Sequence, residues 1–381
     1  MAKTDVQVVT LGDYIERVER RNWNLKFGLK DVRGVTCQKV FIPSRANLEG
    51  RSLEKFLIVE HNEFVFNRRT NRHGDRLCIG FNTSDQPYIL TEDYVCFRVR
   101  SDKAAILSSW YLYLIFLCDE FDRYVRWDSW GSATEFFNWE NMCRVRIPLP
   151  SLKEQEKLVA AWKALRTMKE QNEALAEPLF ALCRSRLHEM KKEYEAVAIG
   201  DYIEQSDDRN RQNNYLIDAV MGISIEKKFI ETKADMTGVS LEPYKLVKPQ
   251  YFGFVTVTSR NGEKISLAYN ETNKTYIVSS SYEVFRVTNT EKLLPEFLFL
   301  IFQQKEFDRY ARFNSWGSAR ETFNFDEMCR VSIPLPPLSV QKALVEVYRC
   351  AAEAKRIAEE ADRLSREICP ALIQYAARGG D

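Results

Sequence analysis

The feature that most constrains this chain is that it contains two copies of one domain. LGDYIE at 11–16 returns as IGDYIE at 199–204, and residues 121–150 match residues 307–336 at 21 of 30 positions. Solenoid repeats have periods of about 20–50 residues, whereas these copies lie 188 residues apart, or 186 after a two-residue deletion. Each copy is therefore a whole domain with its own core.

A long helical segment is predicted after each copy. Residues 152–195 contain no glycine and one proline, and a helix of about 44 residues spans roughly 66 Å. Ser151 and Glu154 have the spacing of a capping box. Apolar residues recur at helical intervals at Leu158, Trp162, Leu165, Met168, Leu175, Leu179 and Leu182, and again at Leu344, Tyr348, Ala351, Ala358, Ala361, Leu364, Ile368 and Tyr375. We expect the two helices to pair as a coiled coil, because a small domain cannot bury stripes of this length. Two unrelated surface helices are the alternative.

The predicted fold class is α+β. We expect two similar mixed α/β domains, related by pseudo-two-fold symmetry and joined by two long antiparallel coiled-coil helices. The predicted boundaries are 1–150 for the first domain, 151–195 for the first helix, 196–336 for the second domain and 337–381 for the second helix. Such a body presents one surface twice, which suits two copies of one partner. Polar residues such as Asp122 and Arg144 in the best-matched segment favour a surface over plain core.

Composition excludes some functions and leaves others open. Lys and Arg number 55 against 54 Asp and Glu, so any basic face must be local. No apolar run near 18 residues predicts a membrane span, and the first residues do not read as a signal peptide. Nine scattered cysteines without a CxxC pair favour free thiols. We therefore expect a cytoplasmic protein with no membrane partner.

Catalytic and metal-binding motifs are absent from the sequence. The three histidines, His61, His73 and His188, have no zinc-ligand spacing relative to the cysteines. There is no GxSxG, HExxH, Walker A, Gly-rich nucleotide loop or Asn-Pro-Pro-Tyr motif. We therefore expect a non-catalytic chain with no cofactor or metal of its own.

A basic segment, FNRRTNRHGDR at 66–76, is the candidate DNA-binding loop, and FVTVTSRNGEK at 254–264 is its duplicate. Arg and Asn side chains form paired hydrogen bonds to guanine and adenine edges. Positions shared by the copies suit phosphate contacts, and divergent positions suit the reading of different bases. The predicted DNA-binding residues are Arg68, Arg69, Asn71, Arg72, His73 and Arg76, with Thr258, Ser259, Arg260, Asn261 and Lys264. A solvated arginine-rich hairpin without a DNA role is the alternative.

Several motifs together resemble the DNA-specificity subunits of bacterial type I restriction-modification systems. They are IPLPSLKEQEKLV at 147–159, IPLPPLSVQKALV at 333–345, Trp-Gly-Ser at 130–132 and 316–318, and LEPYKLVKPQYF at 241–252. The resemblance covers essentially the whole chain in the expected order. The second copy departs from the first where Val340 replaces Glu154 and Pro337 replaces Ser151.

The resemblance implies a role in reading double-stranded DNA. Each domain would read one half of a bipartite site, and the helices would set the distance between the halves. Two copies of a DNA adenine methyltransferase subunit and the restriction and translocase subunits would be partners. S-adenosylmethionine, ATP and Mg²⁺ would belong to those subunits. The predicted partner-docking residues are Trp130, Ser132, Arg144, Trp316, Ser318 and Arg330.

Two other functions stay open at this stage. In the first, a subunit of this kind serves a fused restriction-methylation enzyme. In the second, the chain is a coiled-coil scaffold that binds no DNA, which predicts no local basic face and no sequence-specific retention of duplex DNA.

Overall fold

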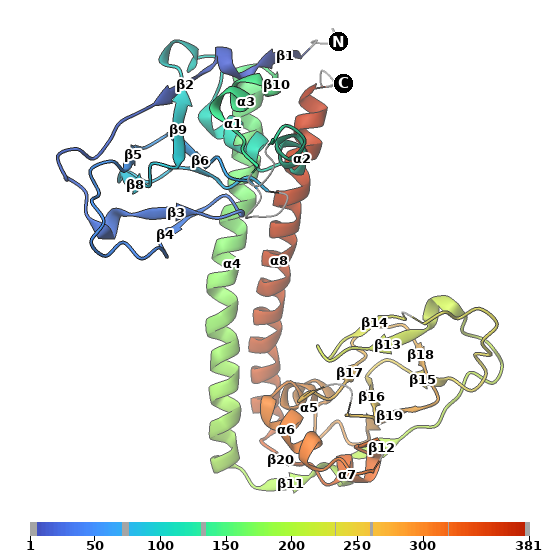
Figure 1. The fold of residues 1–381 in the computed structure, drawn as a ribbon. Coiled ribbons are helices and arrows are strands. Elements are labelled where there is room, and N and C mark those ends of the chain that lie inside the picture. The colour runs from blue at the N-terminus through green and yellow to red at the C-terminus, as the bar shows by residue number, and fades with distance from the viewer. Residues whose placement is uncertain are drawn as a thin grey trace. The chain divides into compact units, whose positions relative to one another are not determined.

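The computed structural model describes residues 6–70, 76–130, 135–232, 234–259, 262–318 and 320–377, with side chains in the last helix described as far as Glu367. The chain divides into two compact units, Met1–Gln171 with Ile357–Asp381, and Asn172–Arg356. Each unit holds one copy of the repeated domain and a part of both long helices (Figure 1).

The first domain is built on a four-stranded antiparallel sheet in the order β2-β9-β6-β7, accompanied by the two-stranded pairs β1-β10, β3-β4 and β5-β8. Its elements are β1 (Gln7–Thr10), β2 (Ile15–Val18), β3 (Arg33–Val35), β4 (Phe41–Pro43), β5 (Leu57–Val59), β6 (Phe64–Asn67), β7 (Ile79–Phe81), β8 (Tyr88–Leu90), β9 (Tyr94–Val99), α1 (Ser109–Phe116), α2 (Asp119–Trp127), α3 (Trp139–Arg144) and β10 (Arg146–Leu149).

The second domain repeats this topology, with the sheet order β12-β19-β16-β17 and the pairs β11-β20, β13-β14 and β15-β18. Its elements are β11 (Ala196–Ala198), β12 (Ile203–Gln205), β13 (Met221–Ile223), β14 (Phe229–Glu231), β15 (Lys245–Val247), β16 (Tyr251–Val255), β17 (Leu267–Tyr269), β18 (Tyr276–Val278), β19 (Tyr282–Val287), α5 (Pro295–Phe302), α6 (Lys305–Phe313), α7 (Phe325–Cys329) and β20 (Ser332–Pro334). The prediction of two similar mixed α/β domains is confirmed.

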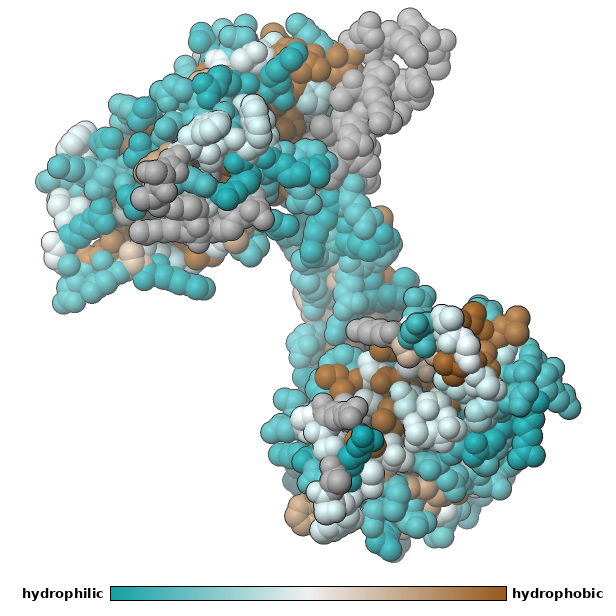
Figure 2. All heavy atoms as spheres, turned by 45° about the vertical axis from the view of Figure 1, so that its right-hand side comes forward, coloured by the Kyte–Doolittle hydropathy of each residue, from teal (hydrophilic) through white to brown (hydrophobic). Residues whose placement is uncertain are grey.

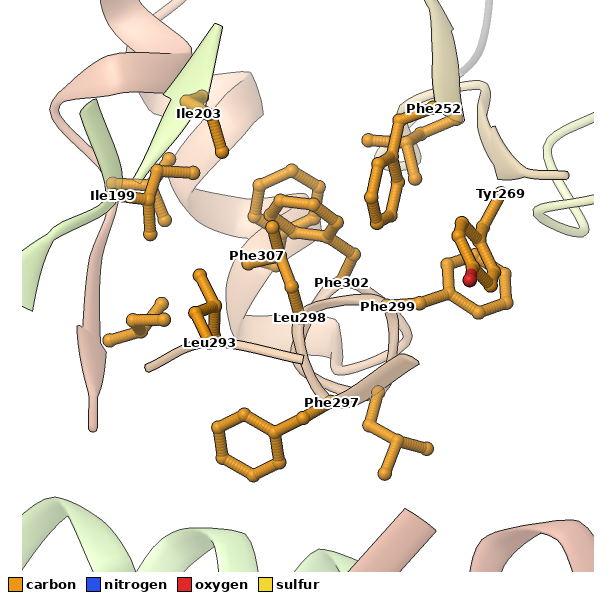
Figure 3. Packing of buried hydrophobic residues seen from close by; sticks show 14 of the residues in the cluster. Ile199, Ile203, Phe252, Tyr269, Leu293, Phe297, Leu298, Phe299, Phe302 and Phe307 are labelled. Atoms are coloured by element: carbon orange, nitrogen blue, oxygen red, sulfur yellow. The ribbon is translucent and has the colours of Figure 1, made fainter. Parts of the chain in front are cut away.

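Phenylalanine rings form the core of each domain between the sheet and the first helix. In the second domain Phe252 and Phe285 stack with ring centroids 4.8 Å apart. Phe302 of α5 meets Phe252 edge-on at 5.9 Å (Figure 3). Phe64 and Phe97 stack in the same way in the first domain, at 5.1 Å. Side chains alternate between the two faces of a strand, so the Phe-Val-Phe run of β6 directs both of its rings to this core.

The duplicated IPLP segment closes each domain and begins each long helix. Gln155, which is fully buried, accepts a hydrogen bond from the Ser108 N–H at 2.9 Å and donates to the carbonyls of Ile106 and Pro150 at 2.8 and 2.9 Å. Gln341 makes the same three bonds in the second domain. Each glutamine therefore ties the start of a long helix to the start of α1 or α5, whose first N–H groups lack helical partners.

The duplicated Gly-Asp-Tyr motif is explained by close packing at its glycine. A Cβ at Gly12 would lie 2.9 Å from both the Cβ and the carbonyl oxygen of Cys143, and one at Gly200 would meet Cys329 at 2.9 and 3.0 Å. Both copies need glycine here because α3 and α7 pass too close for any side chain.

The long helices are α4 (Leu152–Glu193) and α8 (Leu338–Ala377), and they pack together in both units. In the second unit Phe180 of α4 meets Tyr348 of α8 with ring centroids 5.4 Å apart. In the first unit Lys169 of α4 donates to Asp362 of α8 at 2.7 Å. Residue numbers rise along α4 as they fall along α8, so the predicted antiparallel pairing is confirmed.

The predicted stripe on α4 is wrong at three positions. Met168, Leu175 and Leu182 are 46%, 52% and 53% exposed. The covered line passes instead through Lys169, Asn172, Ala176 and Cys183. The sequence prediction followed the largest apolar residues of α4, whereas the side of α4 that is covered carries small and polar side chains. No helix among the described residues is long and apolar enough to cross a membrane.

Candidate nucleic-acid interface

In the first domain the basic segment leaves β6 and runs beside residues 135–137. The Phe137 N–H donates to the Arg68 carbonyl at 2.8 Å, and the Thr70 N–H donates to the Glu135 carbonyl at 3.2 Å. Phe136 in turn exchanges backbone hydrogen bonds with Trp130, at 3.0 and 3.3 Å. Three short extended segments therefore lie side by side, with Arg69 and Trp130 on the outer two.

The second domain repeats this frame bond for bond. The Phe323 N–H donates to the Thr256 carbonyl at 2.8 Å, the Thr258 N–H donates to the Glu321 carbonyl at 3.0 Å, and Thr322 pairs with Trp316. Neighbouring strands lie about 4.8 Å apart, so the candidate DNA loop and the Trp-Gly-Ser segment are two strands apart, within about 10 Å. The sequence did not predict that the candidate DNA-binding and candidate partner-docking residues would adjoin.

A buried ion pair holds the far end of the same loop. Asp122 accepts from Lys39 Nζ at 2.7 Å and from the Leu77 N–H at 3.1 Å, and Lys39 also donates to the Phe116 carbonyl. Lys227 and Asp308 form the matching pair in the second domain, where Asp308 accepts from the Ile265 N–H at 3.2 Å. Burial lowers the pKa of Lys39 and raises the pKa of Asp122, while the attraction between the two charges opposes both shifts.

This pair corrects the interpretation of Asp122 as a surface residue. Asp122 is 5% exposed, and its ion pair with Lys39 joins α2 to the tip of the β3-β4 hairpin. Lys39 has a positive φ of 65° and Lys227 one of 60°, so the hairpin tip takes a left-handed backbone that aims each lysine inward. Asp122 therefore recurs as Asp308 because both domains use the buried ion pair in their fold, and its duplication is no sign of a partner surface.

The described basic residues of the first loop lie at the surface beside acidic partners. Arg68 and Arg69 are half-buried near Asp93, with an Arg68 Nε to Asp93 carbonyl distance of 3.4 Å and an Arg69 to Asp93 carboxylate distance of 3.7 Å. Arg76 is exposed, 3.6 Å from Asp119. Exposed ion pairs contribute about 0–1 kcal/mol, so Arg69 and Arg76 are available to exchange a carboxylate for a phosphate or a base.

The second loop presents different chemistry. Ser259 is exposed, and Lys264 is exposed and paired with Glu226 at 2.8 Å. Thr258 is buried, and its hydroxyl donates to the Glu321 carbonyl at 3.3 Å. Thr70 makes the matching bond to Glu135, so both threonines hold the frame. The predicted residues Asn71, Arg72, His73, Arg260, Asn261 and Ser132 lie outside the described residues.

Those of the predicted docking residues that the structure describes are exposed in both domains. Trp130 is 71% exposed and Trp316 63%, and Ser318 is also exposed. Arg144 pairs with Asp128 at 3.3 Å, whereas Arg330 pairs with Glu327 at 2.8 Å. Two large aromatic residues beside them were missed: Trp127 is 72% exposed and Phe313 is 79% exposed. Their signal was an aromatic residue at the same position of both copies.

Hydrophilic residues cover most of the face shown in Figure 2, and hydrophobic ones gather in separate patches. Within the part of the chain that the structure describes, no group of three or more His, Cys, Asp or Glu side chains is placed to hold a metal ion. The candidate site is therefore made of a loop frame, cations and exposed aromatic rings.

Comparison with known families decides the identity of the chain. The family model described as the type I restriction modification DNA specificity domain matches residues 3–177 and again residues 191–348. The chain belongs to this specificity family. Its two matches agree with the two domains of the fold, and the prediction drawn from the IPLP and Trp-Gly-Ser motifs is confirmed.

A solved structure of a specificity subunit shares the fold. The chain is similar to the type I restriction-modification system S subunit from M. genitalium, with 11% identity, a TM-score of 0.60, and coverage of 99% of this chain and 97% of that one. It also matches the HsdS subunit from Thermoanaerobacter tengcongensis at 14% identity and a TM-score of 0.42, over 99% and 98% of the two chains. No curated protein matched the chain.

Proposed function

We propose that this specificity subunit reads a bipartite DNA site, one half through each domain, and contributes no catalytic group of its own. The observation that carries the proposal is the duplicated loop frame. Both domains hold the loop through the same backbone bonds, while the side chains on it differ. A common frame with different side chains is what two readers of two different half-sites require.

We further propose that the exposed segment of each domain docks one DNA adenine methyltransferase subunit. Trp130 and Trp316 would be the centre of each contact, because exposed tryptophan and arginine residues dominate binding energy at protein interfaces. Trp127 and Phe313 extend the same surface. S-adenosylmethionine would bind the methyltransferase subunits, and ATP with Mg²⁺ the translocase subunits, in a cytoplasmic complex on double-stranded DNA.

Co-expression with the cognate methyltransferase tests both proposals. Native mass measurement should give two methyltransferase copies for each specificity subunit, and methylome sequencing should give one split motif with an undefined spacer. Methylation by this chain in isolation would contradict the non-catalytic role. A stable chain that retains no duplex DNA would favour a coiled-coil scaffold, and a partner that carries both restriction and methylation activities would favour a fused enzyme.

A further inference from the structure

A cavity of about 390 Å³ in the first unit lies beside the candidate DNA-binding loop, and we call it the arginine cavity. It is lined by Arg76, Asp119, Asp122, Arg123 and Arg126. Arg76 is the last residue of the loop, whereas the other four belong to α2. Residues three, four and seven positions apart share one face of a helix, so Asp119, Arg123 and Arg126 form one wall. The proposed function gives no role to this wall.

Both ends of the candidate loop are held against the arginine cavity. Asp122 accepts from the Leu77 N–H at 3.1 Å, which fixes the backbone directly after the loop. Arg126 forms an ion pair with Glu135, whose carbonyl accepts from the Thr70 N–H at 3.2 Å at the start of the loop. A ligand in the cavity would therefore lie next to whatever the loop contacts.

The lining of the arginine cavity is positively charged. Asp122 is neutralised by Lys39 at 2.7 Å, which leaves Asp119 as the one other carboxylate among the described residues that line it. Glu120 and Glu135, which pair with the arginines of α2, are outside the lining. Three guanidinium groups thus share a concave surface with one exposed carboxylate that a ligand can displace. Guanidinium groups bind phosphate through two parallel hydrogen bonds.

All three cations of the arginine cavity recur at the matching positions of the second domain, as Lys264, Arg309 and Arg312. Arg312 pairs with Glu321 and donates to the Thr258 hydroxyl at 3.4 Å, so it joins α6 to the loop frame there too. Asp119 is replaced by a further cation, Lys305. Cations that both copies keep cannot explain two different half-sites, but they suit contacts to the phosphate backbone, which is the same at both.

We propose that the arginine cavity, through Arg123, binds a phosphate of the DNA backbone beside the first half-site, and that Arg309 binds the corresponding phosphate beside the second. The inference rests on the proposed function, in which the loop of each domain reads bases. The arginines of α2 and α6 hold the strand while the loops read it. Each neutralised phosphate adds about 0.9 to the slope of binding against salt concentration.

The test measures binding of the full chain, in complex with its methyltransferase, to a duplex that carries the recognised motif. Arg123 is the residue to change, because its side chain is 74% exposed and its ion pair with Glu120 lies within α2. We expect Arg123→Ala to weaken binding by about tenfold, the scale of one lost charged hydrogen bond, and to lower the salt slope by about 0.9. Base preference in both half-sites should stay the same. Arg309→Ala should have the same effects.

Arg100→Ala is the matched control. Arg100 is an exposed arginine of the same domain that pairs with Asp102 at 3.1 Å. It follows β9, whereas the loop arginines lie near Asp93, before β9 begins. This variant removes the same charge away from the arginine cavity and should keep the native salt slope.

A second measurement identifies the phosphate itself. Methylphosphonate linkages remove one phosphate charge of the duplex at a time. One linkage should weaken binding of the native complex and have no further effect on Arg123→Ala, because the arginine and that phosphate form one interaction. Asp119→Lys, which copies Lys305 of the second domain, should tighten binding and raise the salt slope.

A native salt slope in Arg123→Ala, or an equal loss of slope in Arg100→Ala, would overturn the proposal. So would methylphosphonate linkages that affect the native and Arg123→Ala complexes equally at every position. Loss of a methyltransferase copy from Arg123→Ala, seen by native mass measurement, would show that this surface docks protein instead. A native complex without base preference in either half-site would contradict the proposed function, and the salt slopes would still judge the arginine cavity.

Discussion

At the scale of single residues, the candidate DNA-binding loop shows why agreement and difference between the copies carry separate information. The threonines that hold the frame, Thr70 and Thr258, are buried in both domains. The positions of Arg68 and Arg69 are occupied by Thr256 and Val257 in the second copy. In the proposed function the two domains read different half-sites. Positions that agree between the copies cannot explain that difference, so the differing positions are the candidate base readers.

Arg69→Ala should relax base preference at one position of the first half-site and leave the second half-site unchanged. A guanine contact by arginine is worth about 1–3 kcal/mol of discrimination. Arg72→Ala should weaken binding about equally for all sequences and reduce the salt slope by about one unit. A binding selection on randomised half-sites measures both variants. If Arg72→Ala changes the base preference while Arg69→Ala does not, the two roles are reversed.

Asp122→Asn should destabilise the first domain by about 3–5 kcal/mol, because it leaves the Lys39 ammonium buried without its counter-charge. Asparagine can still accept the hydrogen bond from the Leu77 N–H, so the loss of stability measures the effect of removing the negative charge. Lys39→Met together with Asp122→Asn should recover much of that stability. Chemical denaturation measures the cycle, with Lys227→Met and Asp308→Asn as the matched pair in the second domain. A double variant no more stable than Asp122→Asn would rule out this explanation.

Some of these residues were predictable and others were not. The duplication and the IPLP and Trp-Gly-Ser motifs predicted two domains and their family, because they are local and repeated. The burial of Asp122 was not predictable, since its partner Lys39 lies 83 residues away. The adjacency of Arg69 and Trp130 was missed for the same reason, because only the folded chain brings residues 135–137 between them.

At the scale of elements, the long helices depend on contacts with the domains as well as with each other. A single glutamine at the start of each helix accepts from the N–H of the residue that precedes α1 or α5 and donates to two loop carbonyls. The heptad seam was predicted only in part, because a helix that packs through alanine, lysine and asparagine has no strong apolar signature.

Gln155→Ala should lower the stability of the first domain by about 1–3 kcal/mol, because it leaves the partly buried Ser108 N–H and the two carbonyls without their glutamine partner. Gln341→Ala should act in the same way on the second domain. Denaturant titration of each variant, with half-site binding measured for both domains, locates the effect. Equal weakening of both half-sites by Gln155→Ala would show that the contact does not belong to one domain.

At the scale of the whole molecule, the chain consists of two similar domains, each followed by a long helix. Each domain has its own sheet, its own phenylalanine core and its own loop frame. Independent cores allow the loops to diverge without disturbing the partner domain, and changes at distant sites without shared contacts are usually additive.

The central claim is therefore that one domain reads one half-site. Its most direct test replaces residues 1–150 with the corresponding domain of another specificity subunit and sequences the methylome of cells that carry the hybrid with its methyltransferase. The account predicts that one half of the methylated motif changes while the other half and the spacer length stay the same. A hybrid that changes both halves of the motif would contradict it.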